Sequence, residues 1–119
     1  MATLLYHIAA IEIDWLYNEV LMQDWPPGFE TLFPHPVRDD QGRLFVITGL
    51  SLTDHLDRLE KTRGYVLNTF REMTLDDFRR PRHLPDYEVT PEWVLHHLAQ
   101  HESEHRGEMQ TVYTLAQLS

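Results

Sequence analysis

Apolar residues recur at every third or fourth position in three stretches of the chain, the spacing that places them on one face of an α-helix. This pattern predicts helices over about residues 3–23, 51–73 and 91–116. Their apolar stripes are, in chain order, Leu4, Ile8, Ile11, Trp15 and Met22; Leu52, Leu56, Leu59, Val66, Phe70 and Met73; and Val94, Leu98, Met109, Val112 and Ala116. Three long amphipathic helices predict an all-α fold, arranged as an up-down helical bundle.

Start and stop signals support these bounds. Thr3 can cap the first helix, and the segment 24–28, which contains two prolines and a glycine, ends it. Residues 51–54 resemble a capping box with Asp in place of Glu, and charged residues along the helix that follows are expected to face solvent. The last helix opens with Thr90 as N-cap and Pro91 at the first helical position.

The segments between the helices are less regular. Residues 26–49 contain four of the seven prolines and form a long irregular loop. Within it, the apolar run 44–47 is either a short strand or a loop laid over the bundle, and periodicity does not separate the two. Residues 74–78 look like a second capped start that gives a short helix, and residues 79–87 form a basic loop interrupted by prolines.

Length and charge limit the classes of function. The chain of 119 residues is long enough for one domain, so residues 1–119 are expected to form a single unit. The net charge is −9 and the ten basic residues are scattered, which disfavours nucleic acid and anionic membranes as partners. No signal peptide or membrane span is visible, so a cytoplasmic location is expected. With no cysteine in the chain, any metal site must use His, Asp or Glu.

The candidate chemistry lies on the last helix. His101 and His105 are four residues apart on the stripe that faces the core, so both imidazoles point toward one place. His7, on the core-facing edge of the first helix, is the best third ligand, and His55 on the middle helix is the reserve. Three imidazoles leave a coordination position open for water or substrate. Imidazole suits zinc, nickel, iron and copper, so the ligands do not identify the metal.

Residues 101–105 also match H-E-x-x-H, the metallopeptidase pattern in which two His bind zinc and the Glu, here Glu102, is the general base. That hypothesis is the weaker one, because it needs a ligand further downstream. Only fourteen residues follow His105, and their one acid, Glu108, is too close in sequence to be that ligand.

A third hypothesis, in which the histidines have only a structural role, stays open beside the metal-site and peptidase hypotheses. The protein would then be a non-catalytic, dimeric helical interaction module whose His101 and His105 are core residues. Burying two imidazoles without a shared partner costs several kcal/mol, as it does for other unpaired polar groups. This cost makes a ligand role for His101 and His105 as well supported as a structural role. The remaining histidines are expected at the periphery or in solvent: His96, His97, His35 and His83.

Residues 93–109 resemble the final helix of the DinB-like (DUF664-type) metal-binding four-helix bundles. That family has a His, an acid and then His-Arg-Gly-Gln, and Glu108 stands here where Gln is usual. Residues 55–63 are similar to the family's middle helix. Residues 4–12 resemble the helix that carries its first metal histidine.

The resemblance implies a divalent-metal site of His7, His101 and His105, commonly with zinc, nickel or iron, in a homodimer. Characterised relatives include thiol-dependent transferases and isomerases, so a small thiol is the implied substrate. Glu102 and Glu104 are the candidates for a general base or for a group that supports a ligand. Relatives usually carry a further helix before the first metal histidine, so we expect the fourth wall to come from a partner chain or from residues 26–49. Gly107, inside a helix, would suit a close approach of that kind.

Overall fold

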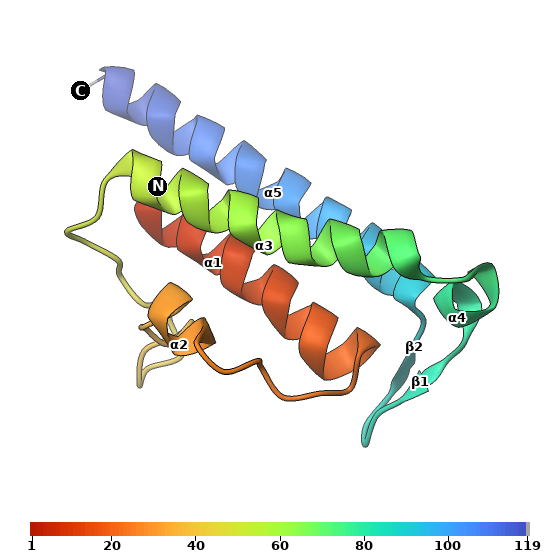
Figure 1. The fold of residues 1–119 in the computed structure, drawn as a ribbon. Coiled ribbons are helices and arrows are strands. Elements are labelled where there is room, and N and C mark those ends of the chain that lie inside the picture. The colour runs from red at the N-terminus through yellow and green to blue at the C-terminus, as the bar shows by residue number, and fades with distance from the viewer. Residues whose placement is uncertain (119) are drawn as a thin grey trace.

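The computed structural model describes residues 1–118, and the three predicted long helices dominate it (Figure 1). The elements are α1 (Ala2–Asp14), a π-helix η1 (Trp15–Val20) that continues it, α2 (Phe29–Leu32), α3 (Leu52–Glu72), α4 (Leu75–Arg79), β1 (Arg82–His83), β2 (Glu88–Val89) and α5 (Pro91–Leu118). The fold is therefore mostly helical, as predicted. Within the described range, no helix combines the length and the apolar composition needed to cross a bilayer.

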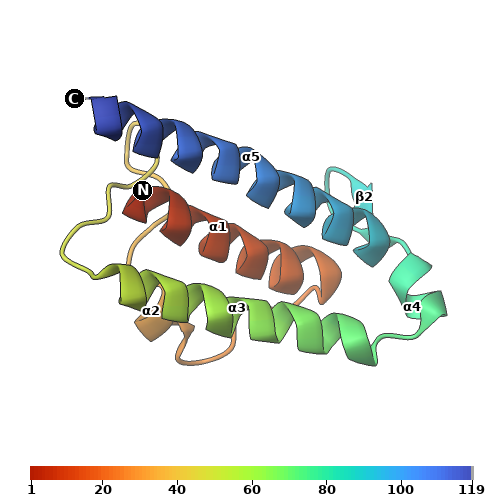
Figure 2. The same ribbon diagram turned by 90° about the horizontal axis from the view of Figure 1, so that it is seen from above.

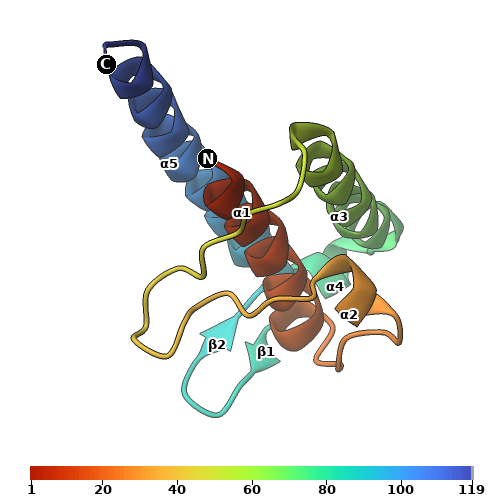
Figure 3. The same cartoon turned by 90° about the vertical axis from the view of Figure 1, so that its left-hand side faces the viewer.

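Helix α1 lies between α3 and α5 and packs against both (Figures 2 and 3). Figure 1 shows that α1 and α3 run in the same direction and that α5 runs back beside them. The simple up-down order is therefore wrong for the first two helices. The segment 21–51 between η1 and α3 is long enough to return to the starting end, which allows parallel neighbours.

The central position of α1 explains its burial. It is enclosed on several sides rather than on one stripe, and its buried residues are Leu5, Tyr6, His7, Ile8, Ala9, Ala10, Glu12 and Ile13. From the predicted stripe, Ile8 is buried, whereas Leu4, Ile11 and Trp15 are only partly so. Met22 is 52% exposed, because η1 ends at Val20 and the chain has already left the bundle.

The inward face of α3 differs from the predicted one. Leu52 and Leu56 are 60% and 50% exposed, whereas the buried residues of this helix are His55, Arg58, Thr62 and Val66. Arg58, expected in solvent, is 8% exposed. Its guanidinium donates from Nε to the Leu32 carbonyl (2.8 Å), donates from Nη1 to His55 Nδ1 (3.0 Å) and lies 4.9 Å from the centre of the Tyr6 ring.

These contacts explain why polar residues turn inward. A buried loop carbonyl requires a hydrogen-bond donor, and a long arginine side chain reaches one while its aliphatic stem packs against apolar neighbours. Arg58 therefore attaches the loop after α2 to both α1 and α3. Apolar periodicity indicated the wrong face of α3 because it cannot detect the hydrogen bond from Arg58 to the Leu32 carbonyl at the end of α2.

The apolar run 44–47 is a loop laid over the bundle, with one isolated bridge between Arg38 and Leu44. Ile47 is buried, and its backbone N–H donates to the side chain of Thr3 at 3.1 Å. Thr3 therefore does not cap α1, whose N-cap is Met1 without a side-chain hydrogen bond. The other predicted caps are confirmed: Ser51 with Asp54, Thr74, and Thr90.

The predicted basic loop contains a small antiparallel hairpin, β1–β2, before α5 begins. Arg82 in β1 is 4% exposed and donates from Nε to the Val20 carbonyl at 2.9 Å. Its other nitrogens donate to the backbone and side chain of Asp77 and to the Arg80 carbonyl. The hairpin thus satisfies a carbonyl at the end of η1 and holds the turn between α3 and α5 against the bundle.

A groove lies between α3 and α5, and Glu12 of α1 also lines it. A cavity of ≈ 130 Å³ there is lined by Glu12, Arg63, Val66, Leu67, Leu95, Leu98, Ala99 and Glu102. Arg63 joins the three helices, since it donates to Glu12 on α1 (2.8 Å) and to Glu102 on α5. Burial raises the pKa of Glu12, and the charge of Arg63 opposes that shift.

We predict that His55 makes the folded state sensitive to acid. Burial, followed by the charge of Arg58, lowers the pKa of His55, while Asp54 opposes the shift. The folded protein then binds fewer protons than the unfolded chain, so the free energy of unfolding decreases as the pH falls below about 6.5. His55→Asn should remove part of that slope in urea unfolding measured between about pH 7.5 and 5. The exposed His96→Asn is the control, and equal slopes in parent and His55→Asn would refute the prediction.

Candidate metal centre

The first predicted ligand, His7, comes from the N-terminal half of α1. Its side chain lies on the surface of α1 that meets α5, and the residue is 6% exposed. The neighbouring Tyr6 points to another side, where its hydroxyl donates to the His35 carbonyl at 2.7 Å and accepts from the His35 N–H. Tyr6 thereby anchors the loop against α1, which helps to hold His7 in place.

The second and third predicted ligands come from the middle of α5. This helix starts where Thr90 accepts a hydrogen bond from the Trp93 N–H at 3.0 Å. From that start it runs antiparallel to α1, and its buried Val94 and Leu98 lie in the core. His101 and His105 follow on the side that meets α1, and both are partly exposed.

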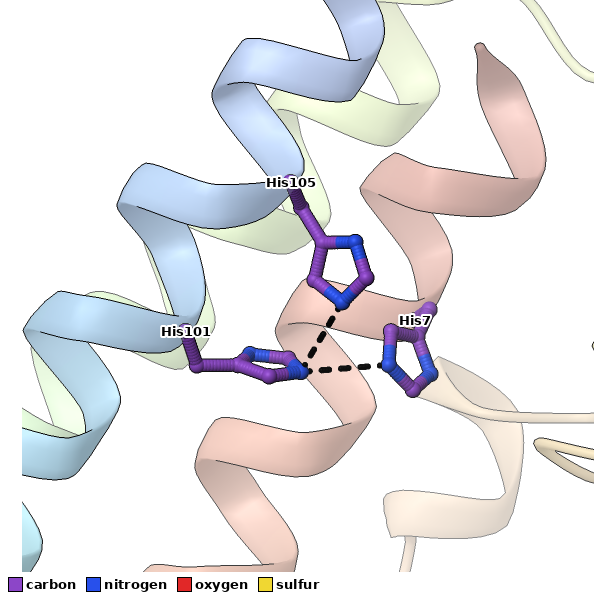
Figure 4. Close-up of side chains that lie close together, drawn as sticks. All are labelled: His7, His101 and His105. Carbon is purple, nitrogen blue, oxygen red and sulfur yellow. Dashed lines mark hydrogen bonds between the residues drawn. The ribbon is translucent and has the colours of Figure 1, made fainter.

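The three imidazoles converge (Figure 4). Nε2 of His101 lies 3.2 Å from Nε2 of His7 and 3.0 Å from Nε2 of His105. One potential ligand atom from each histidine lies within 4.8 Å of the others, and this is the one group of at least three metal-ligating side chains among residues 1–118. The structure thus brings together the three residues that the sequence singled out.

This arrangement fits a metal ion. A tetrahedral ion with nitrogen ligands at 2.0–2.1 Å places those nitrogens about 3.3 Å apart. The Nε2 atoms of His7 and His105 lie at similar distances from Nε2 of His101, 3.2 and 3.0 Å. Without an ion, Nε2 of His101 faces two other ring nitrogens, although a neutral imidazole carries a proton on only one of its nitrogens. A cation at the common point would satisfy all three lone pairs at once.

Burial and neighbouring charges favour the neutral form of His7 and His101. Burial, aided by the charges of His101, His105 and Arg38, lowers the pKa of His7 to about 4. Burial also lowers the pKa of His101, with smaller contributions from His105 and His97 and opposition from Glu104 and Glu108. A metal ligand must be deprotonated, so His7 and His101 are ready to bind a cation at neutral pH.

The acids named from the sequence lie elsewhere. Glu102 is directed to Arg63, in the groove between α3 and α5, rather than to the imidazoles. Glu104 is exposed and accepts a hydrogen bond from Gln100 at 3.4 Å. The peptidase hypothesis therefore loses its general base, and the strands of the described chain are two residues each, too short to bind an extended peptide.

Sequence reasoning missed the acid that does lie beside the cluster. Oε1 of Glu108 is 3.0 Å from Nδ1 of His105, although the two atoms are not aligned as a hydrogen bond. A small rotation of the carboxylate would align them, and a carboxylate on the outer nitrogen commonly orients a metal-binding imidazole. The spacing of three residues on one helix was the available signal. Nδ1 of His7 and of His101 is buried without a partner among the described residues.

The remaining histidines are not part of the cluster. His55, the reserve ligand, is occupied by Arg58. His35 and His83 are exposed, as expected, and His96 is exposed as well. His97 lies between Trp15 and Trp93, with ring centres 4.8 Å from each.

A model of the DinB superfamily matches residues 1–109, a range that includes all three clustered histidines. The chain belongs to the DinB superfamily. This match confirms the resemblance drawn from the sequence. No curated protein and no solved structure matches the chain.

We predict that Glu108 strengthens metal binding in this DinB-superfamily chain. Glu108→Ala should weaken zinc binding about tenfold, because it removes the carboxylate that can orient His105. Glu108→Gln, which keeps a hydrogen-bond acceptor, should fall between parent and Ala. Competition against a chelating dye measures the affinities. Glu104→Ala is the matched control on the same helix, and an equal loss in that variant would mean that only net charge matters.

Proposed function

We propose that this protein binds a divalent metal ion through His7, His101 and His105 and uses it in thiol-dependent group transfer. The observation that carries the proposal is the convergence of the three ring nitrogens, with separations of 3.0 and 3.2 Å. Buried imidazoles aimed at one point are costly unless a shared partner satisfies them. Zinc, nickel and iron all accept this donor set.

Three protein ligands leave room for a further one, which is typical of catalytic rather than structural sites. A divalent ion bound there would lower the pKa of a thiol or water molecule at the open position, so that the nucleophilic form is available at neutral pH. Because His101 and His105 are partly exposed, a small substrate can approach from their side of the cluster.

The thiol has to come from a substrate, since the chain contains no cysteine. In the proposed reaction, the thiol sulfur forms a bond to an electrophilic carbon of a second substrate, whose leaving group departs with the bonding electrons. The thiol proton passes to solvent, to which His101 and His105 are partly exposed. Glu102 is not included, because Arg63 occupies its carboxylate.

We also propose that a second copy of the chain covers the groove between α3 and α5. Leu67 and Leu95 at this groove are 40% and 38% exposed, although apolar helix surfaces normally contribute to stability by packing. The end of α5 projects past α1 (Figures 1 and 2) and carries further exposed apolar residues, Val112, Tyr113 and Leu115.

Two copies can offer these surfaces to each other in a symmetric, closed contact. An added Cβ at Gly107 would meet nothing within 4 Å in the single chain, so the close approach suggested by this glycine would have to involve another chain. These exposed surfaces also favour the second candidate function, a non-catalytic dimeric interaction module. The two candidates differ in their response to metal.

The metal site predicts near-stoichiometric divalent metal in purified protein or after loading with zinc. His105→Ala should lose most of it, because a two-histidine site retains no third ligand, whereas His96→Ala, exposed on the same helix, should not. Elemental mass spectrometry measures the content, and thermal unfolding should shift upward with metal in the parent and in His96→Ala but not in His105→Ala. A folded parent that resists loading and is thermally indifferent to metal would support the interaction module instead.

Thiol binding predicts a spectroscopic change in the cobalt-loaded protein. Addition of 2-mercaptoethanol should produce a sulfur-to-cobalt charge-transfer band, because a thiolate is a favoured ligand at an open position. 2-Methoxyethanol, which lacks the thiol, is the control compound. Cobalt binding without any thiol band would leave the metal site in place and reject the thiol chemistry.

The dimer predicts a mass of two chains in light scattering at micromolar concentrations. Leu95→Glu should shift the protein to monomer, because the charge would be buried in the proposed contact. Val46→Glu introduces the same charge at a loop residue that is 71% exposed, and it should leave the dimer intact. A monomeric parent, or a Leu95→Glu variant that remains dimeric, would contradict the proposal.

A further inference from the structure

A second concave site lies at the other end of the α1–α5 contact, between the β-hairpin and the start of α5. The cavity has a volume of ≈ 610 Å³ and is lined by Trp15, Pro81, Tyr87, Glu88, Val89, Thr90 and Trp93. Its size falls in the range of small-molecule pockets. Trp93 precedes His101 by eight residues, or about 12 Å along a helix, so this pocket is separate from the metal centre.

Aromatic rings form the walls of the pocket. Trp15 and Trp93 lie with ring centres 5.6 Å apart and planes inclined by 46°, so they form a corner instead of a flat stack. His97 supports this corner, because it stacks on Trp93 at 4.8 Å with an angle of 10°. Trp93 nevertheless stays 47% exposed.

Tyr87 provides the third ring and is fixed in place. Its hydroxyl donates to Glu19 Oε1 at 2.6 Å, which connects the hairpin to η1. This hydrogen bond, together with burial and the negative charges of Glu19 and Asp86, raises the pKa of Tyr87 to about 12. The phenol is therefore neutral and its orientation is set, as a rigid wall of a binding site requires.

The charges around the pocket favour a cation. Its lining contains one acid, Glu88, whose Oε1 lies 2.6 Å from Nδ1 of His83, and no basic side chain. The arginines of the neighbouring segment contact acids outside the pocket: Arg79 contacts Glu92, and Arg80 and Arg82 share the single carboxylate of Asp77. Among residues 1–118, Glu19 accepts a hydrogen bond from the neutral Tyr87 hydroxyl and forms no ion pair, so its negative charge remains beside the pocket.

We propose that this aromatic pocket binds a small organic cation with a quaternary or methylated ammonium group. The faces of tryptophan and tyrosine attract such a cation, with tryptophan the strongest. Glu88 and Glu19 add long-range attraction, and an anionic ligand would be repelled by both. Methyl groups on the nitrogen suit the apolar walls better than a strongly hydrated primary ammonium does.

Packing alone accounts less well for the same residues. Aromatic rings that serve only to fill the end of a bundle are expected to be covered, as Trp15 largely is. Trp93 and Tyr87 both line the cavity and are 47% and 45% exposed, and the hydrogen bond to Glu19 fixes Tyr87 in place. The rings therefore stand apart around a space that a ligand of matching chemistry can occupy.

Choline and its uncharged isostere 3,3-dimethylbutan-1-ol provide the test. Choline should bind with a Kd of about a millimolar and at least about fivefold more tightly than the isostere, because only the charge differs between them. Calorimetry gives the affinities, and chemical-shift changes at the Trp15 and Trp93 indole N–H signals locate the site. Chelation of metal before the titration should leave the choline affinity unchanged, which separates this pocket from the metal centre.

Trp93→Leu keeps an apolar side chain and should weaken choline binding about tenfold, whereas Trp93→Tyr should weaken it less. Tyr65→Leu removes a comparably exposed ring on α3 and is the matched control. Equal affinities for choline and the isostere would mean a merely apolar pocket and overturn the proposal. So would the absence of saturable binding, or an equal loss in Trp93→Leu and Tyr65→Leu.

Discussion

Two ionisable side chains on the most buried helix determine how this bundle is assembled. His7 and Glu12 are 6% and 2% exposed on α1, and a buried polar group requires a partner. Glu12 obtains one from α3, through Arg63, which also binds Glu102 on α5. His7 obtains its partners from α5 alone, at His101. The requirement to satisfy α1 therefore fixes the positions of the other two long helices around it.

The two partnerships have different consequences. The Glu12–Arg63–Glu102 group contains opposite charges and is complete within the single chain. The histidine group contains like side chains whose nitrogens face one another, so it is complete only when something electropositive joins it. Polar atoms that lack hydrogen-bond partners within the protein can gain them from a ligand. Such sites lower the stability of the fold, and they are commonly functional sites.

Sequence reasoning succeeded where the information is local. The i, i+4 spacing of His101 and His105, the caps at Ser51 and Thr90, and the extent of the long helices all follow from residues a few positions apart. Local reasoning also selected His7, because its neighbours on the helix are apolar.

The features that sequence reasoning missed depend on contacts between residues far apart in the chain. The inward face of α3 is polar because Arg58 supplies a donor to the Leu32 carbonyl, 26 positions away. The parallel run of α1 and α3 depends on the path of residues 21–51, which carries no signal of direction. Glu102 matched a motif, but Arg63 on another helix occupies its carboxylate. The aromatic pocket joins residues 15, 87 and 93, whose meeting no periodicity predicts.

His7 and His101 are separated by 94 positions in the sequence. A ligand bound by both would therefore close a loop that contains most of the polypeptide. Bringing two such distant points together is opposed by the entropy of a large loop, and that entropy grows only slowly with loop length. An ion bound by all three histidines would therefore link α1 to α5. The binding free energy of such an ion would contribute to folding itself.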